Sequence, residues 1–412
     1  MRNGNVIAAH LVALAEWLRN HQPLWQPSPL HHPSPAWQHS YPKLADWCAS
    51  QAEHGPEDAE QAWMDERLPC DAPTELESLL AQSRALTEVP ALTEVSALSE
   101  ADLRPQARPR RIKARKWEQV LGAESVMAAM VAGRRVVDWC GGKGHLGRRL
   151  AARGATRQLL LVDHTAALLA AGQADGKKAG LNVNTVCADV LDEANTPLVE
   201  ALRPDDAMVA LHACGDLGAR ALHLANERGL RVFGHAPCCW VRTNTPNMSG
   251  SSAVGRAGGI HLELETLRLA TADEGWGPMR RRELRRKALA WRLALDHLVR
   301  RQTGSHHYTP IRVVPRSWLD GDFETFVYHA AHHNSLPLPP SWDAEEVQNI
   351  GQQAARQVRA QGLVRAPFRR VLELWLVLDR AQVLVEAGWQ VEVGTFCSTA
   401  ATPRNLWMRA RR

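Results

Sequence analysis

The chain has 412 residues, of which 45% are hydrophobic and 23% are charged. This composition is ordinary for a globular protein, and it excludes a collagen, a coiled coil and wholesale disorder. At roughly 100–200 residues per domain, the length predicts two or three domains. The net charge of +5 hides an asymmetry, because residues 51–102 carry −11 and residues 103–412 carry +15. A basic body of this kind favours a phosphate-rich partner.

Neither a membrane span nor a disulfide framework is expected. The longest apolar stretch, residues 371–389, is interrupted by four charged side chains: Glu373, Asp379, Arg380 and Glu386. Such a segment is too polar to cross a bilayer. The eight cysteines are scattered along a chain that is too large to need disulfides. We therefore expect reduced thiols and a cytoplasmic protein.

The first 103 residues predict a helical, acidic N-terminal domain or extension. Residues 1–20 read as one helix with Val6, Leu11, Leu14 and Leu18 on a single face. Residues 21–42, rich in Pro, His and Trp, predict a loop, and residues 43–103 predict further helices. A six-residue repeat that starts at Ala85 is interpreted as a linker or the edge of this helical region.

From residue 104 onward, short apolar runs alternate with helical stretches. Strands are predicted at 135–139, 158–163, 183–189, 207–212 and 231–235, each followed by a helix or loop. This alternation is typical of an α/β fold with a parallel sheet and helices on both faces. A flexible loop is expected at Gly250–Gly259, and a helix at 371–387 precedes two strands at 389–396 and 405–409. The predicted segments are 104–260 as the first half of the sheet domain, 261–369 as a basic helical insertion, and 370–412 as the last helix and hairpin.

The loop after the first strand carries the clearest signal for a ligand. Asp138 is followed by Cys140, Gly142 and Gly144, in the pattern Asp-x-Cys-x-Gly-x-Gly, which differs from the dinucleotide motif Gly-x-Gly-x-x-Gly. Glycines here let a ligand approach the backbone at a helix N-terminus. Asp163 ends the second strand and is placed to accept the hydroxyls of a ribose. Asp189 ends the third strand, where an acid can accept an adenine amino group.

Four stretches resemble one branch of the class I methyltransferases, which includes eukaryotic methyltransferase-like proteins and a tRNA ribose 2′-O-methyltransferase. They are Val136–Gly147, Leu211–Asp216, the pair Cys238-Cys239, and Thr402–Asn405. The resemblance implies a Rossmann-like, seven-stranded sheet whose last two strands form a hairpin. It also implies S-adenosyl-L-methionine as the cofactor, held by Asp138, Gly142, Gly144, Asp163 and Asp189.

We add Cys140, His145 and His212 to the candidate cofactor contacts. The sequence departs from the branch at two positions. Cys140 replaces the usual first glycine, so a less tight turn is expected, and Trp240 replaces the histidines that follow the double cysteine in the tRNA enzyme.

Candidate catalytic residues follow the fourth and fifth strands: His212, Asp216, Cys238 and Cys239. His212 could act as a base if the acceptor must lose a proton, and Asp216 could orient it. Alternatively, Asp216 caps a helix and His212 is a packed polar residue. Cys140, Cys214, Cys238 and Cys239 are expected at one edge of the sheet, where they could bind metal or touch the cofactor. We favour plain packing and predict no metal.

Two basic runs, Arg104–Lys116 and Arg280–Arg301, suggest contact with RNA. The sequence thus predicts an S-adenosylmethionine-dependent methyltransferase acting on RNA. Two alternatives stay open: a methyltransferase for a protein or small molecule, and an inactive binding or scaffold protein on the same fold. The oligomeric state is not predicted.

Overall fold

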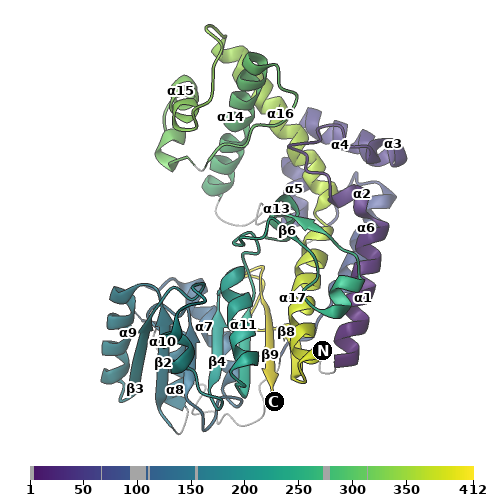
Figure 1. Cartoon of the computed structure of the whole chain (residues 1–412). Coiled ribbons are helices and arrows are strands. Elements are labelled where there is room, and N and C mark those ends of the chain that lie inside the picture. Colours follow the sequence, from purple (N-terminus) through teal and green to yellow (C-terminus); the bar gives the residue numbers. More distant parts are fainter. Residues whose placement is uncertain are drawn as a thin grey trace. The chain divides into compact units, whose positions relative to one another are not determined.

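A computed structural model describes residues 4–65, 67–92, 108–109, 112–153, 156–271, 279–312 and 314–412. The described residues form two compact units, each assembled from segments that are far apart in the chain (Figure 1). The sheet unit takes its residues from 1–20, 86–271 and 370–412. The helical unit takes its residues from 21–85 and 272–369.

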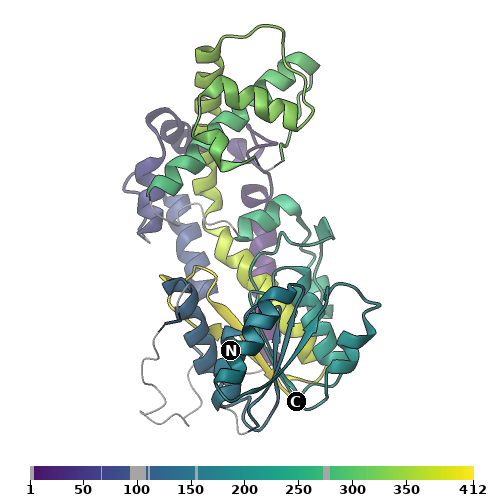
Figure 2. The same cartoon turned by 90° about the vertical axis from the view of Figure 1, so that its left-hand side faces the viewer.

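The sheet unit contains one seven-stranded sheet (Figures 1 and 2). Its strands are β1 (Val136–Trp139), β2 (Gln158–Asp163), β3 (Asn182–Cys187), β4 (Ala207–Leu211), β5 (Val232–Ala236), β8 (Gln390–Thr395) and β9 (Leu406–Arg411). The helices between and around them are α7 (Ala114–Met127), α8 (His145–Arg153), α9 (Ala166–Lys178), α10 (Thr196–Ala201), α11 (Asp216–Glu227) and α17 (Phe368–Glu386). All strands predicted from the sequence form, with ends shifted by one or two residues.

The strand order is β3-β2-β1-β4-β5-β9-β8. The first five strands pair in parallel, whereas β9 lies antiparallel to both β5 and β8. This is the α/β sheet with a terminal hairpin that the resemblance predicts, so the expected fold is confirmed. Because the parallel strands share a direction, the loops that follow β1, β2, β4 and β5 meet at one edge of the sheet.

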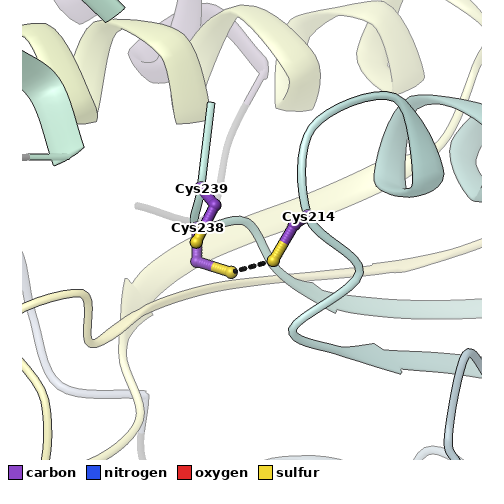
Figure 3. Close-up of side chains that lie close together, drawn as sticks. All are labelled: Cys214, Cys238 and Cys239. Atoms are coloured by element: carbon purple, nitrogen blue, oxygen red, sulfur yellow. Dashed lines mark hydrogen bonds between the residues drawn. The ribbon is translucent and has the colours of Figure 1, made fainter. Parts of the chain in front are cut away.

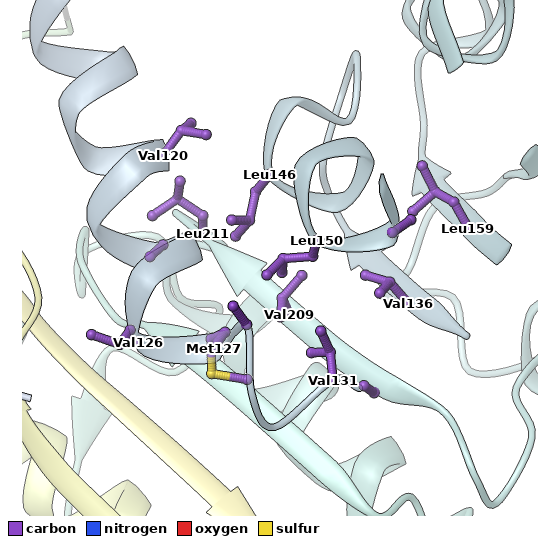
Figure 4. Packing of buried hydrophobic residues seen from close by; sticks show 14 of the residues in the cluster. Val120, Val126, Met127, Val131, Val136, Leu146, Leu150, Leu159, Val209 and Leu211 are labelled. Atoms are coloured by element: carbon purple, nitrogen blue, oxygen red, sulfur yellow. The ribbon is translucent and has the colours of Figure 1, made fainter. Parts of the chain in front are cut away.

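A buried apolar cluster fixes the helices on one face of this sheet (Figure 4). Val120 and Met127 of α7 and Leu150 of α8 pack with Val136 of β1 and Val209 of β4. Alternate residues of a strand point to opposite faces. On β5, accordingly, Val232 joins this cluster, while His235 meets α11 on the other face.

The charged side chains within the apolar stretch near the C-terminus lie on α17, where Asp379 and Arg380 bond to neighbouring loops. Asp379 accepts hydrogen bonds from the backbone N–H groups of Ser251 and Ser252, at 2.7 and 3.0 Å. Arg380 donates to the carbonyl oxygen of Gly215 at 2.8 Å. These buried charges tie the helix to neighbouring loops. Among the helices of the described residues, none combines the length and the hydropathy that crossing a membrane requires.

Two local expectations are wrong. The loop expected at Gly250–Gly259 contains a short helix, α12 (Ala253–Ala257), whose cap Ser252 accepts from the N–H of Gly255. Asp379 holds that cap, so long-range bonds decide the local structure here. In α1 (Gly4–Asn20), Ile7 is fully buried with Leu11, Leu14 and Leu18, whereas Val6 is 49% exposed. Remaining short elements of the sheet unit are β6 (Asn247–Met248), β7 (Leu262–Glu263) and α13 (Leu264–Thr271).

The helical unit contains α2 (Gln22–Trp25), α3 (Trp37–Ser40), α4 (Pro42–His54), α5 (Glu57–Met64), most of α6 (Thr74–Thr87), α14 (Met279–Thr303), the 3-10 turn η1 (Arg316–Leu319), α15 (Phe323–His333) and α16 (Ala344–Arg365). The two units divide the chain differently from the segments expected from the sequence. Helix α1 belongs to the sheet unit, and residues 21–85 pack with the insertion instead of forming a separate domain. One reason is the ion pair between Glu60 of α5 and Arg359 of α16, whose atoms are 2.7 Å apart.

Candidate functional site

The loop between β1 and α8 brings its backbone to the edge of the sheet. Gly142 and Gly144 have φ angles of 58° and 66°, which favour glycine. A Cβ atom on Gly144 would lie 2.3 Å from Leu161, so the loop packs directly on β2. Helix α8 then starts at His145 with its first N–H groups at the same edge.

The turn at Cys140 was expected to be less tight than one with glycine, but Cys140 adopts the backbone conformation of a glycine. Its φ angle is 54°, the left-handed conformation that glycine ordinarily supplies. A side chain in this conformation costs roughly 1–2 kcal/mol. His212, at the end of β4, has a φ angle of 68° and bears the same strain. Strained backbone of this kind is concentrated at functional sites.

Asp138 is a buried carboxylate directly below the glycine loop. One of its oxygens accepts a hydrogen bond from the N–H of Gly147 at 2.9 Å. Gly147 must lack a side chain, because a Cβ there would lie 2.6 Å from the Cβ of Asp138. Burial raises the pKa of Asp138 to about 6, although the bond from Gly147 and the Lys116 charge act in the opposite direction. A cation brought to this carboxylate would be strongly favoured.

Asp163 ends β2, as predicted, and Asp189 lies two residues beyond the end of β3. The oxygens of Asp163 accept from the N–H groups of Gly142 and Thr165, each at 2.9 Å, so this residue also shapes the glycine loop. Asp189 is exposed and accepts from the N–H of Leu191 at 3.0 Å. A carboxylate has about four lone-pair sites, so both residues keep acceptor capacity for a ligand.

These residues fit S-adenosylmethionine. Among the described residues, no salt bridge joins a lysine or arginine to Asp138, Asp163 or Asp189, although the charges of Lys116 and Arg148 are close enough to lower the pKa of Asp138. His164 lies 3.5 Å from Asp163. Three carboxylates without such a salt bridge suit a ligand that brings an ammonium, a sulfonium and hydroxyl donors. The space beside Gly142 is open, because a Cβ atom placed there would come no closer than 3.6 Å to Leu168 or Asp163.

Two of the predicted cofactor contacts, His145 and Cys140, carry titratable side chains that their surroundings keep neutral. The half-buried ring of His145 meets Arg148, with 3.2 Å between Nδ1 and the guanidinium nitrogen. Burial, then the charges of Arg148 and Lys116, lower the pKa of His145. Burial raises the pKa of the Cys140 thiol to about 12, with a smaller contribution from Asp163. Both side chains are therefore neutral neighbours of the carboxylates at neutral pH.

Gln119 on α7 is a site residue that the sequence reasoning missed. Its side-chain NH₂ donates to the carbonyl oxygen of Ala401 at 3.1 Å, so its side-chain oxygen faces Nε2 of His212. Nε2 must then carry the proton, and Nδ1 of His212 keeps a lone pair. Burial, followed by the Lys116 charge, lowers the pKa of His212 to about 3. No local pattern marks Gln119, because its partner lies 93 residues away.

Asp216 does not contact His212 through a hydrogen bond. Its carboxylate accepts from the N–H of Asn244 at 2.8 Å, while its own N–H donates to the carbonyl oxygen of Arg242 at 3.0 Å. Asp216 therefore fastens the loop after β5 to the start of α11. Its predicted catalytic role stays a prediction, whereas the alternative that Asp216 caps a helix is wrong, because Gly215 is the N-cap of α11 and the Asp216 carboxylate bonds to the Asn244 loop instead.

Three of the four expected cysteines form a cluster, which we call the thiol cluster: Cys214, Cys238 and Cys239 (Figure 3). The Sγ atoms of Cys214 and Cys238 are 3.1 Å apart, and all three lie within 4.8 Å of one another. Cys140 is not a member. Hydrogen bonds from Cys214 and Cys238 lower the pKa of Cys239 to about 2, and the charges of Arg404 and Arg242 act in the same direction. Donating those bonds raises the pKa of Cys238.

The two basic runs have different outcomes. Arg104, Arg110 and Arg111 of the first run lie outside the described residues. In the second run, Arg280 and Arg281 are exposed on α14. Most other cations of α14 bond within the helical unit: Arg282 to Gln61, Arg286 to Glu60, Lys287 to the Leu319 carbonyl, Arg292 to the Ile311 carbonyl, Arg300 to Asp296 and Arg301 to the Ser341 carbonyl. Contact of this run with RNA stays a prediction, and most of its cations already have partners within the helical unit.

Comparison with known proteins supports the cofactor. Residues 115–245 match the profile of a family described as a methyltransferase domain. No curated protein matches the chain significantly. The profile supports a methyltransferase domain in this part of the chain, and the strand order is the one expected for the class I fold. The enzyme class and the cofactor predicted from the sequence are confirmed at this level.

Two of the similar solved structures overlap with about a third of this protein. One is an S-adenosylmethionine-dependent methyltransferase from Clostridium acetobutylicum, with 14% identity, a TM-score of 0.23, and coverage of 34% of this chain and 52% of that one. Another is magnesium protoporphyrin IX methyltransferase from Synechocystis, with 14% identity, a TM-score of 0.25, and coverage of 31% and 61%. The chain thus spans between half and two thirds of these two relatives.

Proposed function

We propose that this methyltransferase domain transfers a methyl group from S-adenosylmethionine to RNA. The observation that carries the proposal is the distribution of charge at the edge of the sheet. The carboxylates follow β1, β2 and β3, whereas the loops after β4 and β5 carry no free carboxylate among their described residues and lie beside cations. We call the part of this sheet edge beside β1, β2 and β3 the acidic half and the part beside β4 and β5 the basic half. The acidic half suits the cationic cofactor, and the basic half suits an anionic acceptor.

Three cations supply the basic half: Lys116, Arg242 and Arg404. The charges of Lys116 and Arg404 act on His212, and those of Arg404 and Arg242 act on Cys239. Arg242 is exposed, whereas Lys116 lies close enough to Asp138 for that charge to act on it. Burial lowers the pKa of Lys116, so a phosphate that pairs with it would also restore its charge. Phosphates are therefore better partners for this surface than neutral small molecules.

The chain's own residues have distinct tasks in the transfer. Asp138, Asp163 and Asp189 would hold the cofactor, which supplies a methyl group on a sulfonium that is already a good leaving group. Much of the remaining acceleration is positioning and desolvation. If the acceptor is a hydroxyl, Nδ1 of the neutral His212 can accept its hydrogen bond and then its proton, and Gln119 fixes the ring for that task. Because burial lowers the pKa of His212 to about 3, the ring is a weak base, and much of its contribution is to orient the acceptor.

The alternative of an inactive scaffold loses part of its motivation. One of its two reasons was Cys140 in place of a glycine, but Cys140 adopts the glycine conformation; the other, the absence of an Asn/Asp-Pro-Pro-Tyr motif, stands. The carboxylates that a cationic cofactor needs are present, and no salt bridge among the described residues joins them to a lysine or arginine. Retained binding residues are what an active enzyme requires.

Labelled cofactor tests the proposal. Purified full-length protein and tritiated S-adenosylmethionine are incubated with separated RNA and protein from cells that lack this chain. We expect label in the RNA fraction and background in the protein fraction. Label in protein alone would show a protein acceptor, and no label in either fraction, with cofactor binding intact, would favour the scaffold.

The basic half is tested with a double variant, Lys116→Gln/Arg242→Gln. RNA binding should weaken, and the dependence of log affinity on log salt should flatten by about 0.7 for each lost phosphate contact. The matched control is Lys177→Gln/Lys178→Gln, which removes two exposed lysines from the last turn of α9, at the opposite edge of the sheet. Equal salt slopes in the two variants would contradict the proposed surface.

A further inference from the structure

The thiol cluster has the composition of a metal site. Its three members come from two loops, Cys214 after β4 and Cys238-Cys239 after β5 (Figure 3). Because β5 ends at Ala236, the adjacent cysteines lie outside the strand, and their side chains are not forced to opposite faces. The pairs of sulfur atoms are separated by 3.1 Å to at most 4.8 Å. Three thiolates on one zinc ion, with Zn–S bonds of about 2.3 Å, are separated by about 3.8 Å.

The two loops are fastened to each other, which keeps the sulfur atoms together. A Cβ on Gly215 would lie 1.7 Å from the carbonyl oxygen of Arg242, so the backbones touch. Asp216 bonds to the same stretch through its N–H and its carboxylate. Arg380 donates to the Gly215 carbonyl and lies over the ring of Trp240, 4.3 Å from its centre. Ligands held by their surroundings in this way are typical of metal centres.

The charges around the cluster fit a zinc ion with three thiolates, which has a net charge of −1. Arg242 and Arg404 lie close enough to act on Cys239, and Lys116 lies close enough to act on Cys214 and Cys238. No Asp or Glu belongs to the cluster among the described residues. Cations beside a negatively charged metal centre are electrostatically favourable, whereas packed neutral thiols gain nothing from them.

We infer that Cys214, Cys238 and Cys239 bind one Zn²⁺ ion, with the fourth coordination position left to water or another oxygen ligand. Soft thiolates select zinc over magnesium or calcium. A fourth Cys, His, Asp or Glu within the same reach is not found in the described residues, and three protein ligands with one open position are typical of a catalytic zinc ion. An acceptor hydroxyl bound there would lose its proton more readily. This use of the ion rests on the proposed function, whereas binding of the ion does not.

Metal content tests the site without any assay of activity. Full-length protein is purified without chelator and under reducing conditions, and its zinc is measured by mass spectrometry. We expect about one zinc per chain. Replacement of zinc by Co²⁺ should give the intense visible bands of a tetrahedral centre and the thiolate-to-cobalt charge-transfer band, and both readouts use the unmodified protein.

Single variants identify the ligands. Cys214→Ser, Cys238→Ser and Cys239→Ser should each weaken zinc binding at least tenfold and diminish the charge-transfer band. Cys187→Ser and Cys397→Ser, which change cysteines elsewhere in the sheet unit, should leave both unchanged.

Three outcomes would overturn the inference: reduced protein that takes up well under one zinc from a stoichiometric supply, zinc retained in all three ligand variants, or cobalt bands without thiolate charge transfer. Failure of RNA methylation with full zinc content would instead contradict only the proposed function. Methylation by fully zinc-free protein would contradict only a role for the ion in transfer.

Discussion

Gln119 holds His212 in a single tautomer, although the two residues lie on elements 93 residues apart. The amide group of Gln119 is oriented by its bond to the Ala401 carbonyl, so its oxygen is the atom that faces His212. Three parts of the chain, α7, the end of β4 and the loop before β9, thus converge on one imidazole. The lone pair that remains on Nδ1 belongs to a ring that burial keeps neutral.

The first prediction concerns this pair. His212→Asn should lower kcat by about 10–10²-fold, at or below the usual contribution of a positioned base because the low pKa of His212 makes it a weak one, with a much smaller change in KM. Asparagine is chosen because it tolerates the positive φ angle at this position. Gln119→Glu, which keeps an oxygen for Nε2, should lose less activity than Gln119→Ala. Full kcat in His212→Asn, measured by single-turnover transfer, would exclude His212 as the base.

The second prediction concerns the acids of the cofactor site. Asp163→Ala should weaken S-adenosylmethionine binding by about 1.5–3 kcal/mol, the range for a hydrogen bond to a charged group. Asp189→Ala should weaken binding less, because Asp189 is exposed. Asp192→Ala is a matched control, since Asp192 makes the same local bond to a backbone N–H two residues later. Calorimetry that shows equal affinities for Asp189→Ala and Asp192→Ala would remove Asp189 from the site.

The third prediction concerns pH. Burial raises the pKa of Asp138 to about 6, and a cationic ligand binds its ionised form. Cofactor affinity should therefore be constant above pH 7 and fall by up to about tenfold per pH unit below pH 6. Asp138→Asn should bind weakly and show a flatter profile. A parent protein with the same affinity at pH 5 and pH 7.5 would contradict the assignment of Asp138 to the cofactor.

The fourth prediction concerns acid stability. Burial, then the charge of Arg380, lowers the pKa of His235 to about 3, and its Nδ1 has no hydrogen-bond partner among the described residues. Between pH 6.5 and pH 3 the unfolded chain binds the proton and the folded chain does not, so stability falls as the pH falls, by up to about 1.4 kcal/mol per unit. His235→Gln should show a smaller loss between pH 6.5 and 5 in denaturant titrations. An unchanged pH dependence would show that His235 is not the proton-linked group.

The fifth prediction concerns the strained turn. Cys140→Gly should be about 1 kcal/mol more stable than Cys140→Ala, because only glycine adopts a φ angle of 54° without strain. Comparing these two variants cancels the loss of the thiol. The free energy of unfolding, with cofactor absent, is the measurement. Equal stabilities would mean that the turn relaxes when the side chain changes.

The sequence by itself determined the sheet and the cofactor half of the site. Strand and helix signals are local, since apolar periodicity reports which face of an element is buried. The acids Asp138, Asp163 and Asp189 could be placed because each follows a predicted strand, and the carboxyl ends of parallel strands share an edge. Both inferences need only neighbours in the chain and one rule of topology.

Only the tertiary structure decided which distant side chains meet. It paired Gln119 with His212, gathered three cysteines and left Cys140 apart, and gave most cations of α14 partners within the helical unit. It also turned the expected flexible loop at residues 250–259 into a capped helix through Asp379, a residue more than 120 positions away. Such contacts depend on the distance between segments that are far apart in the chain, and neither segment's sequence indicates which other segment it will meet. Hydrogen bonds and sulfur contacts act over about 3–4 Å, a range that no periodicity or spacing can resolve.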